Sequence, residues 1–124
     1  MSQYEQITIE DIELGLLGNV TIVQFREPRV TDLLAIEQLG RELYQLIEEP
    51  VHRKLVLDFS EVMFFSSAAI GKLISLSGKL RALSGILKLC NLRPEVLDVL
   101  RVCKLDTVFD IRQDRNDAML SFGS

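Results

Sequence analysis

Two adjacent serines, Ser66 and Ser67, stand where an apolar segment gives way to a predicted helix. A serine hydroxyl at the start of a helix accepts a hydrogen bond from a backbone N–H that has no partner within the helix. A phosphate on such a hydroxyl adds a charge of roughly −1.5 to −2 at pH 7. The helix dipole tolerates that charge, whereas an acidic or tightly packed partner surface would not. The two serines are therefore candidates for a cap, for a modification site, or for both.

The other reactive residues form neither a catalytic nor a metal-binding pattern. His52 is the only histidine, and no glycine-rich phosphate loop follows a predicted strand. Cys90 and Cys103 each lie among aliphatic residues and are expected to be buried free thiols. With no Cys-x-x-Cys and no second histidine, a zinc site has no ligand set, and His52 is expected to be a loop residue. We therefore expect a protein that is not an enzyme and holds no metal or cofactor.

Length and composition favour one globular domain over residues 1–124. The chain is 48% hydrophobic and 26% charged, which is ordinary for a globular protein of this length. A net charge of −4 argues against nucleic-acid binding, which requires a basic surface. No apolar stretch reaches bilayer length, and the N-terminus lacks a basic lead and an apolar signal core. A cytoplasmic location without membrane insertion is expected.

Hydrophobic periodicity and turn residues predict the elements that position the serines. Thr31 is the expected N-cap of the first helix, and Gly85 is the expected C′ residue of the second. The predicted strands are 5–14, 20–25, 54–59, 86–91 and 108–112, with a turn at GLLGN (15–19); the predicted helices are 32–48, 67–83, one that begins at Pro94, and 116–122.

This order predicts an α/β fold with a mixed sheet. An antiparallel hairpin comes first, and strand–helix–strand units with right-handed parallel crossovers follow it. The helices are expected to pack against the sheet, and the apolar strand at 54–59 is expected to be buried on both faces.

Over nearly its whole length the chain resembles a STAS domain, most sharply at LDFSEVMFFSSAAIG (57–71). In an alignment without gaps, Ser67 falls on the serine that the family phosphorylates, and Ser66 falls where the family usually has Asp. Ala68 and Ala69 replace a Ser/Thr and a Gly, and the pair Ile70–Gly71 matches a Leu-Gly pair. The resemblance implies the STAS fold.

The resemblance also implies a function in bacterial transcription regulation, that of an anti-sigma factor antagonist. Such a domain would bind an anti-sigma factor with serine kinase activity and so free a sigma factor. Phosphorylation of Ser67 would break the contact, and a phosphatase would restore it. The implied contact surface is the loop and the start of the helix that follows it.

Six residues are predicted to contribute to partner binding. Phe65 is either an exposed docking residue, as Phe64 could also be, or part of the core. Lys72 lies on the predicted outer face of its helix, which is either a basic contact or an ordinary solvated face. Arg29 falls near a position that is often acidic in antagonists, so a partner suited to an acidic residue would meet a reversed charge. The full set is Ser66, Ser67, Ala68, Lys72, Phe65 and Arg29.

Two other functions remain open from the sequence. A STAS domain that lacks the switch could hold a regulatory assembly together, and the absence of Asp at position 66 favours this. Alternatively, the domain could sense a small ligand, or be the STAS subunit of a lipid or anion transporter.

Overall fold

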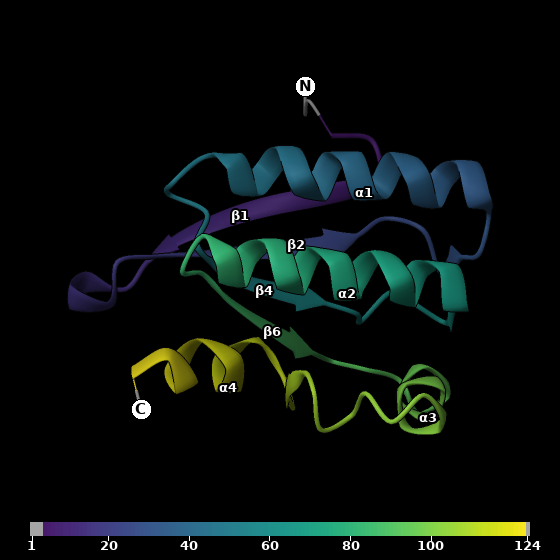
Figure 1. Cartoon of the computed structure of the whole chain (residues 1–124). Coiled ribbons are helices and arrows are strands. Elements are labelled where there is room, and N and C mark those ends of the chain that lie inside the picture. The colour runs from purple at the N-terminus through teal and green to yellow at the C-terminus, as the bar shows by residue number, and fades with distance from the viewer. Residues whose placement is uncertain (1–3, 124) are drawn as a thin grey trace.

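The computed structural model describes residues 4–123, and its main elements follow the predicted order (Figure 1). The strands are β1 (Ile7–Glu13), β2 (Asn19–Phe25), β3 (Arg29–Val30), β4 (Lys54–Asp58), β5 (Phe64–Phe65), β6 (Ile86–Cys90) and β7 (Asp110–Arg112). The helices are α1 (Leu33–Glu48), α2 (Ser67–Ala82), α3 (Pro94–Val102) and α4 (Arg115–Leu120).

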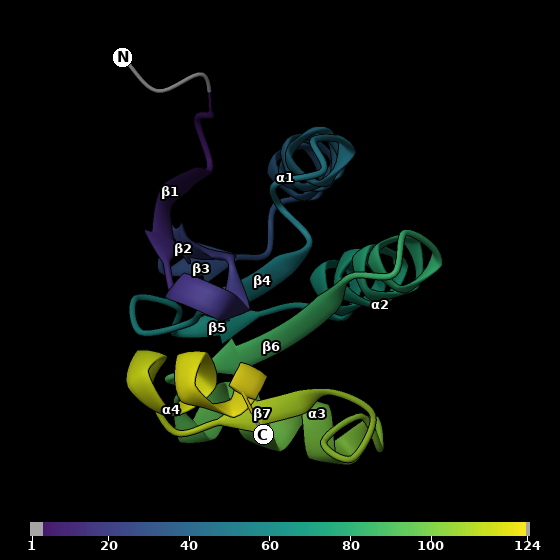
Figure 2. The ribbon, with the colours of Figure 1, turned by 90° about the vertical axis from the view of Figure 1, so that its left-hand side faces the viewer.

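The main sheet has the strand order β1-β2-β4-β6-β7. β1 runs antiparallel to β2, with Ile7 opposite Phe25 and Glu13 opposite Asn19. The other neighbouring strands are parallel. The predicted mixed sheet with an N-terminal hairpin is confirmed. Figure 2 shows α1 and α2 together on one face of the sheet and α4 on the other.

Two hydrophobic clusters hold these layers together. Because side chains alternate along a strand, β2 and β4 contribute to both clusters and read as apolar runs. The larger cluster, between the sheet and the helices α1, α2 and α3, includes Val23, Phe25, Leu55, Leu57 and Leu89. The smaller cluster, under α4, comprises Val20, Ile22, Val56, Cys90 and Ala118.

The parallel strands set where the helices begin. α1 and α2 both start beyond the carboxyl ends of strands, so their N-termini lie at the same end of the molecule, toward which the arrows of β4 and β6 point in Figure 1. Asp32, rather than Thr31, is the N-cap of α1, and its carboxylate accepts a hydrogen bond of 2.9 Å from Ala35 N. Leu33, the first residue of α1, is 68% exposed at this end.

The hairpin turn and the end of α2 also differ from the prediction in detail. Gly15 and Gly18 take positive φ around a short 3-10 turn, whereas Asn19 already belongs to β2. After α2, Ser84 rather than Gly85 is the left-handed residue, with φ of 62°. Ser84 N donates to Arg81 O and Gly85 N donates to Leu80 O, which is the Schellman pattern.

Position 85 has no room for a side chain, which is why it holds a glycine. A Cβ at this position would lie 2.8 Å from Arg53 O and closer still to the Leu80 side chain. We expect Gly85→Ala to lower the free energy of unfolding by about 1–3 kcal/mol, because neither the backbone nor the packed leucine can withdraw freely. Gly78→Ala is the matched control, since nothing lies within 4 Å of its Cβ position. That change should raise stability by about 0.5–1 kcal/mol, because alanine favours a helix interior. Urea unfolding of both variants measures the difference, and equal stabilities would contradict the steric explanation.

The surroundings of Cys90, Cys103 and His52 agree with the sequence predictions only in part. Cys90 is buried as expected, and burial raises the pKa of its thiol to about 12. Cys103 is exposed, because it follows α3 on the solvent side, so the prediction that both thiols are buried is wrong for Cys103. His52 lies in a loop, but it is buried: its Nδ1 is 2.9 Å from Leu46 O and its Nε2 is 3.4 Å from Asp11 Oδ1.

Among residues 4–123, no helix is long and apolar enough to cross a membrane.

Candidate functional site

The two serines have different environments at the start of α2. Ser66 is the N-cap: its Oγ accepts a hydrogen bond of 3.2 Å from Ala69 N, and its own N donates to Val30 O at 3.1 Å. Ser67 is the first residue of the helix and is exposed. Its hydroxyl makes no hydrogen bond to another residue within 4–123. Ser66 therefore has the structural role, and Ser67 is free to react.

A short parallel ladder between β3 and β5 holds the loop that precedes the serines. Arg29 pairs with Phe64 and Val30 pairs with Phe65. Pro28 O accepts hydrogen bonds from Met63 N at 2.8 Å and from Phe64 N at 3.0 Å. Two-residue strands carry no periodic signal, so the sequence did not predict this ladder, although Pro28 correctly marked the end of β2.

Within the ladder, the side chains of Phe64 and Phe65 lie on opposite faces of β5. Phe65 is 6% exposed and packs in an aromatic cluster, with its ring centroid 5.3 Å from that of Phe59 and 6.1 Å from that of Phe25. Phe64 is 44% exposed. Of the two alternatives for Phe65, the structure shows the core one, because alternation along β5 buries Phe65 and exposes Phe64. A contact between Phe65 and a partner stays a prediction.

The last residue of β4, Asp58, has a buried carboxylate that holds the start of the following loop in place. Asp58 is 2% exposed. Its Oδ1 accepts hydrogen bonds from Ser60 N at 2.9 Å and from Asn91 Nδ2 at 3.0 Å, and its Oδ2 accepts one from Arg115 Nε at 2.6 Å. Burial alone would raise the pKa of Asp58, but the hydrogen bonds from Asn91, Arg115 and Ser60 outweigh it and hold the pKa below its usual value.

Arg115 connects this network to α4 and to the first two strands. Its guanidinium also lies 3.3 Å from Glu10 Oε1 and donates to Gln24 Oε1 at 3.2 Å. Gln24 Nε2 in turn donates to Ser60 Oγ at 3.3 Å. The loop that leads to the serines is therefore anchored both to the sheet and to the helix on the far face. The sequence analysis did not find Arg115.

Lys72 and Ala68 are both half-buried, so neither side chain lies on a fully free surface. Lys72 Nζ is 3.0 Å from a carboxylate oxygen of Glu37, and its side-chain stem crosses Gly40, where a Cβ would lie 2.9 Å from Lys72 Cδ. Ala68 is half-buried and packs against the main cluster. Of the predicted contact residues, Ser67 and Arg29 are therefore the two that are exposed.

The exposed residues Arg29, Met63, Phe64 and Ser67 form what we call the serine surface. The Cζ atom of Arg29 lies 4.4 Å from the centroid of the Phe64 ring. A shallow groove of about 320 Å³ runs beside this surface and is lined by Thr31, Met63, Phe64, Phe65, Ser66, Glu95 and Val99.

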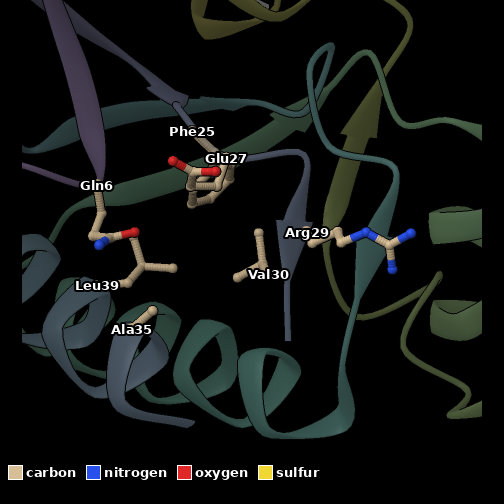
Figure 3. A pocket seen from close by; sticks show the side chains of 7 residues that line it. All are labelled: Gln6, Phe25, Glu27, Arg29, Val30, Ala35 and Leu39. Carbon is tan, nitrogen blue, oxygen red and sulfur yellow. The ribbon is translucent and has the colours of Figure 1, made fainter. Parts of the chain in front are cut away.

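A small cavity lies on the inner side of β3. Arg29 and Val30 both line this cavity, and Figure 3 shows the guanidinium of Arg29 extending away from Val30. The volume of the cavity is about 30 Å³, which is far too small for an organic ligand. Within the described part of the chain, no group of three or more His, Cys, Asp or Glu residues could hold a metal ion.

Known proteins resemble the chain in both sequence and fold. A family model, the STAS domain, matches residues 11–118. BtrV of Bordetella bronchiseptica, assigned as a candidate anti-sigma factor antagonist, is 30% identical over 86 residues, which are 69% of this chain and 73% of BtrV.

Solved structures agree with that match. A candidate anti-sigma factor antagonist from Thermotoga maritima has a TM-score of 0.79 at 14% identity, with 95% of each chain covered. The anti-sigma factor antagonist SpoIIAA, at 16% identity, has TM-scores of 0.73 in its unphosphorylated form and 0.64 in the phosphorylated form from Bacillus. The unphosphorylated comparison covers 95% of this chain and 97% of SpoIIAA, and the phosphorylated one covers 92% and 98%. Together with the mixed sheet and the loop that opens α2, the match over 11–118 shows that the chain belongs to the STAS domain family.

Proposed function

We propose that the protein is an anti-sigma factor antagonist that is switched by phosphorylation. In its unphosphorylated form it binds an anti-sigma factor with serine kinase activity through the serine surface. Phosphorylation of Ser67 ends that contact, and a phosphatase restores it. The protein itself acts by binding and not by catalysis. The observation that carries the proposal is the exposed, unengaged Ser67 hydroxyl at the first residue of α2, in a chain 30% identical to BtrV.

The choice of Ser67 over Ser66 follows from their hydrogen bonds. Ser66 Oγ already accepts the bond from Ala69 N, and a kinase would have to disrupt that cap to reach it. The loss of a serine N-cap typically costs about 1 kcal/mol. Ser67 carries no such role, so its hydroxyl can be modified without a change in the helix.

The domain itself can accommodate a phosphate on Ser67. The first turn of α2 contains no acidic residue that would repel it. Backbone N–H groups without helical partners and the positive end of the helix dipole favour a negative charge here. Phosphorylation would therefore change the surface and leave the fold intact.

A bound partner would not accommodate the phosphate in the same way. Met63 and Phe64 are 46% and 44% exposed, so the serine surface offers apolar side chains for a partner to cover. A doubly charged group within such a contact must lose its water without gaining a partner for its charge. Release of the partner is the expected consequence.

The proposal is tested with ATP and a purified anti-sigma factor that has serine kinase activity, taken from the organism that makes this protein. Intact-mass and fragment-mass spectrometry would follow the wild type, Ser67→Ala and Ser66→Ala. We expect one phosphate on Ser67 in the wild type and in Ser66→Ala, and none in Ser67→Ala. A phosphate on another residue would contradict the assignment of the site. Stable binding of the kinase without any phosphorylation would overturn the switch and favour a constitutive scaffold.

A further inference from the structure

Arg29 carries an exposed positive charge at the start of β3. Among the residues from Tyr4 to Gly123, none places an acidic oxygen within ion-pair distance of its guanidinium, whereas Lys72 is paired with Glu37. The contact that Arg29 does make is with the Phe64 ring, at 4.4 Å from Cζ to the centroid. A cation–π contact orients a guanidinium but leaves its N–H groups free for an acceptor.

The backbone holds this pair in place before any partner arrives. Arg29 and Phe64 occupy paired positions of the β3–β5 ladder, and the hydrogen bonds to Pro28 O fix the strand that carries Phe64. Side chains that are already ordered lose less conformational entropy when they bind. A preorganised arginine beside an aromatic ring is the kind of residue pair that dominates the binding energy of protein interfaces.

We propose that Arg29, stacked on Phe64, selects the partner by binding an Asp or Glu side chain on its surface. This inference rests on the proposed function, because the occupant is the anti-sigma factor that covers Ser67. The carboxylate would accept two hydrogen bonds from the guanidinium, while an apolar residue of the partner covers Phe64.

The position of a carboxylate on the partner, and not the overall charge of the partner's surface, would determine recognition by Arg29. The protein has a net charge of −4, and Glu95 lines the groove beside Phe64. A uniformly acidic partner surface would thus be repelled, whereas a single carboxylate opposite Arg29 would be accepted. Such an arrangement contributes to specificity as well as to affinity.

The test measures binding of the unphosphorylated protein to the same purified kinase, without ATP, at about 50 and about 300 mM NaCl, which changes the screening length. Arg29→Gln should weaken binding roughly tenfold, and Arg29→Glu on the order of a hundredfold, with a smaller dependence on salt than the wild type. Phe64→Leu keeps an apolar side chain without the ring face and should give an intermediate loss. The matched control is Arg81→Glu, which is exposed at the far end of α2, about 20 Å along the helix axis from Ser67. This variant should bind within about twofold of the wild type.

A charge exchange makes the test specific. Replacement of each exposed acidic residue of the kinase by Arg, one at a time, should yield one variant that restores binding to Arg29→Glu. If the wild type binds but Arg29→Glu binds as tightly as Arg81→Glu, the carboxylate contact is overturned and the antagonist function stands. If the wild type does not bind the kinase at all, the proposed function fails, and this inference fails with it.

Discussion

Ser67→Glu is expected to weaken binding of the anti-sigma factor by on the order of a hundredfold, because it places a permanent carboxylate within the serine surface. Ser67 is exposed at the first position of α2, so the new side chain can point into solvent in the free protein. In the complex it would be covered by the partner. Titration calorimetry against the purified anti-sigma factor measures the change.

The folded domain should not lose stability through this substitution. A negative charge in the first turn of a helix typically adds about 0.3–1 kcal/mol. Ser75→Glu is the matched control, since Ser75 is also exposed on α2 and lies about two turns further along the helix. Similar affinities for Ser67→Glu and Ser75→Glu would show that the partner does not cover Ser67.

Arg115→Met is expected to lower the free energy of unfolding by about 3 kcal/mol, because it leaves the Asp58 carboxylate buried without its cation. Asp58 is 2% exposed and its Oδ2 lies 2.6 Å from Arg115 Nε. Asp58→Asn removes the charge that needs a partner, so Arg115→Met should cost much less in that background. Urea unfolding of the wild type, the two single variants and the double variant gives the coupling energy. A loss below about 1 kcal/mol for Arg115→Met would show that the pair behaves like an exposed salt bridge.

Labelling of the two cysteines tests whether Arg115 holds α4 against the sheet. Cys90 belongs to the hydrophobic cluster covered by α4, whereas Cys103 is exposed. A thiol reagent should label Cys103 at once and Cys90 only when the structure opens, because the Cys90 side chain is fully buried and out of reach of the reagent. Burial also raises the pKa of the Cys90 thiol, which lowers its reactivity further. Arg115→Met should speed the labelling of Cys90 if Arg115 holds α4 against the sheet.

The lowered pKa of Asp58 makes the free energy of unfolding depend on pH. The pKa is lower in the folded protein than in the unfolded chain, so the unfolded chain binds the proton more readily. The stabilisation is therefore complete above the ordinary pKa of an aspartate and is lost as the pH falls through the folded value. Removal of Arg115 raises the pKa of Asp58, and the loss should then begin at a higher pH than in the wild type.

The fold was predictable from sequence because its main elements carry strong patterns. β2 and β4 are apolar on both faces, as strands buried on both sides of a sheet must be. α1 shows helical spacing, and Pro94 stands at the first turn of α3, as expected. The start of the second helix at Ser67 was also predicted, and the structure places it there.

The rest of the site depends on contacts between distant segments. Asp58 and Arg115 are 57 residues apart, and neither side chain indicates locally that it pairs with the other. Whether Phe64 or Phe65 faces the solvent is decided by a two-residue ladder with β3, which is too short to leave a pattern. The contact between Arg29 and Phe64 depends on the same ladder, because pairing of the two residues places the guanidinium over the ring.

The most direct test of the switch compares one protein in two chemical states. The chain phosphorylated on Ser67, verified by mass spectrometry, and the same sample after phosphatase treatment are each titrated into the purified anti-sigma factor. We expect the phosphorylated form to bind on the order of a hundredfold more weakly and the treated form to regain the affinity of the unmodified protein. Equal affinities of the two forms, with the phosphate confirmed on Ser67, would contradict the proposed function.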